Sequence, residues 1–454
     1  MDSNSAQPET VDTSDMGSVA SSSGLLFAAR LATNSGFFVA VVLIARALHP
    51  AGRGSVAFIT VTALVIAMVS LIGLDNATIV YATRHEPLRA TLLANLLSVG
   101  AVVPFVFGSF VCLALLLLPG ARPHDVLPID LAVLLAGSVI ASVGNCGSAY
   151  LVGCRRFRAK ALADIAMPWG YAAILFVIYA FSQMTVTRVV VAWTCAQLIS
   201  TVAYLSSALS IAGVNHPSWR LLRDTTAFGI GTWPGSISTF LNARVDQTIM
   251  GLISSEGSLG IYAVAVNASE IVLYLPHAVA TTLLPHIANS PPGERVAQTL
   301  KVARALVLLT VISILVAAVA GWLLIPPVFG HSYRGSINPF LWLLPGALGF
   351  AFMRIFVAAL IASDSTARAS LGPIAALVTG IALDLLLIPR YGANGAAVAA
   401  SLAFFAGGIT AIAMHSRTAT YRLRELVPRR QDVDLIKGLA LRMAQSARAA
   451  LRSR

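Results

Sequence analysis

Several ionisable residues lie inside apolar stretches of this chain, where charged side chains are rare and costly, and six of them are candidates for chemistry. The basic ones are Arg30, Arg244 and Arg354, and the acidic ones are Asp246, Glu270 and Asp384. An arginine at the centre of a membrane-spanning helix costs about 2.5–3.5 kcal/mol on insertion scales. Such residues therefore either pair with an opposite charge on a neighbouring helix or face a hydrated cavity.

The arginines predict an anion-binding cavity, with pairing to the acidic residues as the structural alternative. A guanidinium stays charged when partly desolvated, and its planar fork matches the oxygens of a phosphate. Asn34 follows Arg30 by one helical turn and Gln247 follows Arg244 by three residues, so each shares a face with its arginine. On a continuous helix, Asp246 points away from Arg244. The predicted substrate-binding set is Arg30, Asn34, Arg244, Gln247 and Arg354.

The acidic residues indicate a second chemistry, in which a cation is coupled to movement of the anion. A carboxylate at membrane depth can be neutralised by H⁺ or can bind Na⁺, and intramembrane acids commonly mark such ion pathways. We therefore predict ion coupling at Asp246, Glu270 and Asp384.

The sequence predicts no catalytic residue, no metal site and no cofactor. The four cysteines have no metal-ligand spacing, and the sequence contains no ATP-binding P-loop. The net charge of +12 does not indicate nucleic acid, because the basic residues sit in short loops and a C-terminal tail. A membrane enzyme such as a glycan polymerase or ligase needs a sizeable outer loop with catalytic groups, whereas the outer loops here are short.

The charged residues are carried by a chain that is almost entirely apolar helix. Its 454 residues are 57% hydrophobic and 11% charged, against about 25% charged in a typical soluble domain. Twelve apolar stretches are each long enough to cross a hydrocarbon core of about 30 Å. They are residues 25–45, 55–81, 91–118, 128–153, 161–181, 189–212, 226–252, 259–288, 302–324, 337–362, 369–388 and 393–415. The predicted fold class is an all-α membrane protein with twelve transmembrane helices.

The distribution of basic residues predicts the orientation. Most of the 31 lysines and arginines fall in alternate loops and in the tail after residue 415, which places both termini in the cytoplasm. Residues 1–23 are polar and acidic, and we expect a disordered cytoplasmic tail there. Residues 416–454 form a basic cytoplasmic tail, either an amphipathic surface helix or a disordered segment.

The spans divide into two matching halves. We expect an N-lobe with spans 1–6 over residues 24–212, a cytoplasmic linker over 213–225 and a C-lobe with spans 7–12 over 226–415. Small-residue patterns recur between the halves at a nearly constant offset, as after a tandem duplication. Transport folds of this kind hold the substrate near the midplane between the halves. Gly231, Pro234 and Gly235 loosen the start of span 7, which is the predicted hinge.

Several segments resemble the oligosaccharide (Wzx-type) flippases of the multidrug/oligosaccharidyl-lipid/polysaccharide (MOP) exporter superfamily. They are Leu43 to Gly54 after the first span, Arg244 to Gln247 in the seventh, Leu259 to Ala265 and Leu283 to Ala288 in the eighth, and Leu387 to Ala397 between the last two. Each segment is loose, but their order and spacing together cover most of the chain.

The resemblance implies two six-helix lobes around a central cavity that opens alternately to either side of the bacterial cytoplasmic (inner) membrane. The implied cargo is a polyprenyl-pyrophosphate-linked oligosaccharide, moved from the inner to the outer leaflet for surface polysaccharide biosynthesis. Implied partners are membrane lipids, H⁺ or Na⁺, and the polysaccharide polymerase and export machinery. In such proteins cavity arginines are thought to hold the pyrophosphate, a role carried here to Arg30, Arg244 and Arg354 as candidates. The alternative is a cation-coupled drug or metabolite antiporter of the same superfamily.

Overall fold

The structure is a computed structural model that describes residues 13–118, 123–213, 215–288, 291–363, 365–417, 419, 421 and 423–427. Within these residues every regular element is helical. The α-helices are α1 (Thr13–Ser70), α2 (Leu74–Arg84), α3 (Arg89–Leu117), α4 (Pro128–Gly153), α5 (Phe157–Phe181), α6 (Val186–Ala212), α7 (Trp219–Leu241), α8 (Val245–Ile253), α9 (Glu256–Ala288), α10 (Pro292–Phe329), α11 (Ile337–Leu343), α12 (Gly346–Ala362) and α13 (Thr366–Ser416). Short 3₁₀ helices are η1 (Glu86–Leu88), η2 (His331–Ser336) and η3 (Leu423–Leu426).

Many of these helices are long and apolar enough to cross a membrane. Eight in the described residues meet that condition, or nine if His331–Leu343 and Gly346–Ala362, which meet at 45°, form one bent span. The expectation of an all-α membrane protein is therefore confirmed. The expected N-terminal tail differs in part, because α1 begins at Thr13 and residues 13–23 are helical. Residues 1–12, and residues 428–454 of the expected basic tail, lie outside the described residues.

Two of the longest helices each contain a sharp kink. Backbone angles are non-helical at His49 in α1 (φ 56°) and at Gly392 in α13 (φ 54°). A straight helix of 58 residues, the length of α1, would measure about 87 Å, far beyond a bilayer core of about 30 Å. The turn expected between the first two spans is thus a single residue, and Arg53 lies inside the helix rather than in a loop.

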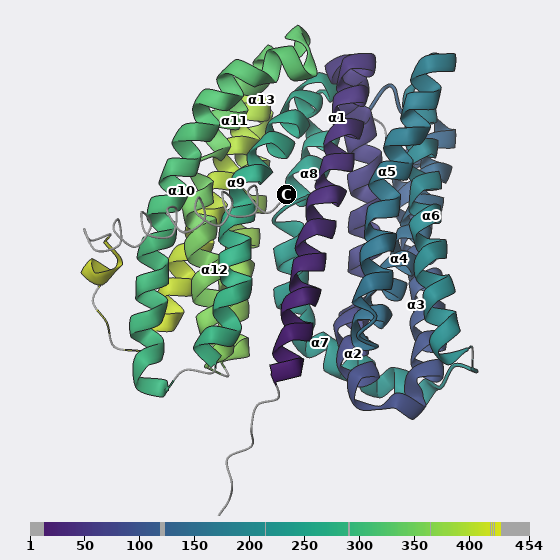
Figure 1. The fold of residues 1–454 in the computed structure, drawn as a ribbon. Coiled ribbons are helices and arrows are strands. Elements are labelled where there is room, and N and C mark those ends of the chain that lie inside the picture. The colour runs from purple at the N-terminus through teal and green to yellow at the C-terminus, as the bar shows by residue number, and fades with distance from the viewer. Residues whose placement is uncertain are drawn as a thin grey trace, which may run out of the picture.

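Many helix contacts form within each half of the chain. In the N-terminal half (α1–α6), α1 packs on α5, and α4 packs on α3 and α6. In the C-terminal half (α7–α13), α12 packs on α9, α10 and α13. Figure 1 shows α9 to α13 on one side, α2 to α6 on the other, and α1, α7 and α8 between them. The two halves meet where α1 contacts α9 and where α2 contacts α7.

One end of the molecule is closed by backbone contacts between the halves. We call it the Pro50 end, where α1 kinks and α9 begins. A Cβ on Gly54 would overlap the carbonyl oxygen of Glu256, and one on Gly260 would overlap that of Pro50, so only glycine allows this approach. At the same end the Glu256 carboxylate accepts a hydrogen bond from the backbone N–H of His124. Arg46 on α1 donates to the carbonyl oxygens of Pro327 (2.6 Å) and Val328 (2.8 Å) on α10.

Further along the bundle, a second set of contacts joins α2 to the first part of α7. Gly73, at φ 75°, lies against Gly229 so closely that a Cβ on either would overlap the backbone of the other. Asn76 Nδ2 donates to Ser236 Oγ at 2.8 Å. α7 therefore packs against the N-terminal half, although it belongs to the C-terminal half of the chain.

Candidate functional site

The polar residues predicted in span 7 lie around a break in the helix. α7 ends at Leu241, and α8 begins at Val245. Asn242 Nδ2 donates to the carbonyl of Pro373 on α13 at 2.9 Å, which anchors the break to the C-terminal half. Broken helices at membrane depth are tolerated where the freed backbone is buried in protein or lines a cavity. The break makes this region suited to a binding site.

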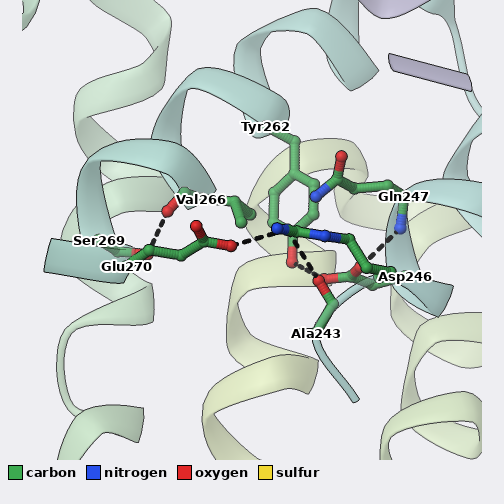
Figure 2. Close-up of polar contacts among 8 residues, drawn as sticks. Ala243, Asp246, Gln247, Tyr262, Val266, Ser269 and Glu270 are labelled. Atoms are coloured by element: carbon green, nitrogen blue, oxygen red, sulfur yellow. Dashed lines mark hydrogen bonds and ion pairs between the residues drawn. The ribbon is translucent and has the colours of Figure 1, made fainter. Parts of the chain in front are cut away.

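Arg244 forms an ion pair across the break with Glu270 on α9. Its Nη1 lies 2.7 Å from Glu270 Oε1 (Figure 2), and the two side chains keep 27% and 23% of their accessible surface. The structural alternative, that Arg244 pairs with an acidic residue, is thus what the structure contains. Because both groups remain partly accessible, the pair can be reached and exchanged by a competing anion.

Asp246 lies in the first turn of α8 and is almost fully buried. Its carboxylate accepts hydrogen bonds from the Tyr262 hydroxyl on α9 and, at 2.7 Å, from the backbone N–H of Gln247 (Figure 2). A carboxylate is also favoured there by the helix dipole. Because the helix is broken before residue 245, the facing that a continuous helix predicts for Arg244 and Asp246 does not apply.

A second buried carboxylate, Asp384 on α13, lies within electrostatic range of Asp246. Asp384 is 2% exposed, and its Oδ1 has no hydrogen-bond partner among the described residues. A buried, unpartnered carboxylate is costly unless it is protonated or holds a cation. The structure thus brings together Asp246 and Asp384, two of the three residues predicted for ion coupling, while Glu270 pairs with Arg244.

One face of α9 brings the three predicted arginines together. Glu270, Tyr274 and His277 recur at spacings of four and three residues, which places them on one side of the helix. Tyr274 lies within electrostatic range of Arg30, Arg244 and Glu270. His277 lies within electrostatic range of Arg30 and Arg354. Guanidiniums from α1, the α7–α8 break and α12 therefore lie within electrostatic range of this face, which carries one carboxylate.

The three arginines differ in their contacts. Arg30 is exposed, and Arg354 is half-buried with an Nε that has no hydrogen-bond partner in the described part of the chain. Only Arg244 has an acidic partner there. We call Arg30, Arg244 and Arg354 the central arginines. Their excess positive charge suits a phosphate or another multivalent anion.

The remaining predicted site residues do not contact the central arginines in any described hydrogen bond or ion pair. Asn34 is half-buried on α1, and Gln247 is 4% exposed beside Asp246. The predicted hinge residues Gly231, Pro234 and Gly235 lie within unbroken α7, and the helix is interrupted only after Leu241. His277 was missed by the sequence analysis, although its spacing from Glu270 and Tyr274 signals a shared face. Arg53 was also missed, because it was assigned to a loop.

A protein-family model described as "Polysaccharide biosynthesis protein" matches residues 19–290, more than half of the chain. The chain belongs to this family. The region that matches the polysaccharide biosynthesis proteins includes Arg30, Arg244, Asp246 and Glu270, whereas Arg354 and Asp384 lie beyond it. No match was found among curated proteins.

The fold is that of the MOP superfamily. The structure described as "Lipid II flippase MurJ, inward closed conformation" superposes with a TM-score of 0.74 at 12% identity, covering 88% of this chain and 89% of the other. An inward-facing multidrug resistance MATE family transporter gives a TM-score of 0.69 at 14% identity, covering 85% of this chain and 94% of the other. An outward-facing structure of such a transporter gives a TM-score of 0.52 at 13% identity, covering 86% of this chain and 95% of the other. The family confirms the expected link to polysaccharide biosynthesis, and the fold is shared with solved flippases and transporters, as the resemblance implied.

Proposed function

We propose that this protein moves a polyprenyl-pyrophosphate-linked oligosaccharide from the inner to the outer leaflet of the bacterial cytoplasmic membrane by alternating access. The proposal includes twelve spans in two lobes, with both termini in the cytoplasm. Membership in the polysaccharide biosynthesis family and the fold of a lipid II flippase support a lipid-linked glycan as cargo.

The single observation that carries the proposal is the grouping of the central arginines around one face of α9. Among the described residues, Glu270 is the only acidic side chain that forms an ion pair with these three arginines, so the group keeps a net positive charge. Arginine forks bind phosphate oxygens in pairs, so a pyrophosphate is a suitable ligand. The lipid tail would stay in the bilayer while the head group enters between the halves.

The closed Pro50 end supports a state that is shut toward the outside. In the proposed orientation this end faces away from the cytoplasm, and the Gly54 and Gly260 contacts seal it. The TM-score is higher against an inward-facing MATE transporter (0.69) than against an outward-facing one (0.52), which agrees with that state. Cargo would then enter from the cytoplasmic side and leave after the Pro50 end parts.

The driving force has two candidate sources. An elementary charge crossing about 100 mV gains about 2.3 kcal/mol, so a dianionic pyrophosphate moving outward would gain roughly 4.6 kcal/mol. The buried carboxylates Asp246 and Asp384 support inward movement of H⁺ or Na⁺ as a second source. The same carboxylates, with the MATE-like fold, favour a cation-coupled antiporter as the second candidate function.

Removing the protein from the cell tests the proposal. A flippase leaves its lipid-linked oligosaccharide in the cytoplasm-facing leaflet, and the surface glycan disappears. Normal surface glycan with increased sensitivity to organic cations would instead support the antiporter.

A further inference from the structure

Arg53 is a buried cation that has no counterion among the described residues. It lies on α1 one turn beyond the His49 kink, and only 7% of its surface is accessible. Its Nε has no hydrogen-bond partner, and no ion pair of its side chain occurs within the described residues. A charged group held away from water without a partner is strongly disfavoured. An anionic ligand would offset this cost at Arg53.

Two tyrosine hydroxyls lie near the same guanidinium. Tyr171 on α5 and Tyr333 in η2 are both within electrostatic range of Arg53. Each hydroxyl is buried and lacks a hydrogen-bond partner among the described residues. The contacts of α1 with α5 and with η2 bring these three side chains together from separate parts of the chain.

The position of Arg53 connects it to the central arginines. Arg244 lies within its electrostatic range. On the other side, the neighbouring residue Gly54 makes the backbone contact with Glu256 that closes the Pro50 end. Arg53 thus lies within electrostatic range of one central arginine and next in sequence to the contact that closes the Pro50 end.

We propose that Arg53, Tyr171 and Tyr333 form a second oxyanion subsite, which receives the phosphoryl group of the cargo before release at the Pro50 end. The guanidinium supplies charge and several N–H donors, and the two hydroxyls supply O–H donors, which together suit a phosphate oxygen. This inference rests on the proposed function for the identity of the cargo.

The subsite is built from both halves of the molecule, which gives a means of release. Arg53 and Tyr171 belong to the N-terminal half, and Tyr333 belongs to the C-terminal half. Separation of the halves at the Pro50 end withdraws Tyr333 from the other two residues. The bound anion then loses a donor and gains access to water in the same movement.

The test is pyrophosphate binding to the full chain in nanodiscs of phosphatidylcholine. Inorganic pyrophosphate is the probe, and an Arg354→Gln background weakens binding at the central arginines. Adding Arg53→Gln should lower the affinity at least tenfold. Arg188→Gln removes the same charge from an exposed arginine that bonds Ser182 and Gln183, and should leave the affinity unchanged.

Thermal unfolding without the probe separates a binding role from a packing role. Arg53→Gln removes an unpaired buried charge, so the midpoint should stay equal or rise. A lower midpoint with unchanged affinity would mean that Arg53 is a packing residue, and the subsite would be wrong. If this variant does not fold, Tyr171→Phe with Tyr333→Phe keeps both rings and should lower the affinity about threefold, whereas no change overturns the proposal.

Competition with polyprenyl pyrophosphate tests whether the cargo supplies the bound phosphate. A comparison with glycan export separates failure of the subsite from failure of the proposed function. Displacement of the probe by polyprenyl pyrophosphate supports the cargo as ligand, and failure to displace it overturns that assignment. If Arg53→Gln loses affinity for pyrophosphate but the wild-type protein exports no glycan, the subsite stands and the proposed function is refuted. If Arg53→Gln keeps its affinity and the wild-type protein does export glycan, the proposed function stands and the subsite is refuted.

Discussion

Arg244 and Glu270 form an ion pair that spans the break between α7 and α8, with Nη1 and Oε1 2.7 Å apart. The pair joins the helix break to the face of α9 that lies within electrostatic range of Arg30 and Arg354. In the proposed function, Glu270 occupies the guanidinium that the phosphate of the cargo would bind, so the cargo would have to displace it. A carboxylate that competes with the cargo in this way would limit its affinity and assist its release.

Glu270→Gln should tighten anion binding. Removing the competing charge frees Arg244, and a partly exposed pair of this kind is worth about 1 kcal/mol, or roughly a fivefold lower dissociation constant. Pyrophosphate titration in nanodiscs measures the change. Weaker binding in Glu270→Gln would show that the pair positions Arg244 for the anion rather than competing with it.

Arg354→Gln should lower glycan export at least tenfold without lowering the amount of folded protein in the membrane. Its Nε has no partner among the described residues, so the substitution breaks no hydrogen bond seen there, and intramembrane arginines themselves cost about 2.5–3.5 kcal/mol. Surface glycan and protein level measured in the same cells test this. Arg188→Gln is the matched control, and equal export by the two variants would remove Arg354 from the site.

Asp384→Asn should abolish transport driven by an H⁺ or Na⁺ gradient and spare transport driven by membrane potential. Asp384 is buried beside Asp246 without a hydrogen bond to its Oδ1, so its charge is available to a cation. Proteoliposomes with each gradient imposed separately provide the measurement. Asp125→Asn, at an exposed position, is the control. Gradient-driven transport that survives in Asp384→Asn would rule out coupling at this carboxylate.

Gly260→Ala should weaken closure of the Pro50 end. The added Cβ would overlap the carbonyl oxygen of Pro50, whereas a Cβ on Gly257, one turn earlier, meets no atom within 4 Å. Cross-linking of Asp125→Cys to Ser255→Cys, in a chain without its native cysteines, reports closure across the two halves. The yield should fall at least threefold in Gly260→Ala and stay constant in Gly257→Ala. Equal yields would show that this contact does not hold the end shut.

Much of the fold follows from the sequence, because a lipid bilayer requires both apolar side chains and helices long enough to cross it. The apolar stretches predicted around Leu131 and Val302 lie within α4 and α10. The pairing of Arg244 with an acidic residue was also among the alternatives that the sequence left open. Such inferences depend on which residues occur, and not on how the backbone turns.

The rest depended on local backbone geometry that residue types do not specify. His49 takes a positive φ, which residues other than glycine rarely adopt, so the first turn is one residue long and Arg53 lies within the helix. The break at Asn242 to Arg244 likewise interrupts the helix, so an argument from continuous helical spacing does not apply to Arg244 and Asp246. Arg53 and His277 acquire their significance only from neighbours distant in the chain.

The most direct test of the central claim is a leaflet assay on purified protein. Proteoliposomes carry a polyprenyl-pyrophosphate-linked oligosaccharide, and a membrane-impermeant sugar-modifying enzyme reports how much of it faces outward. Wild-type protein should make nearly all of the lipid accessible under an imposed potential, and Arg244→Ala should leave about half inaccessible, as in protein-free vesicles. Accessibility that is equal in wild-type, Arg244→Ala and protein-free vesicles would contradict the account.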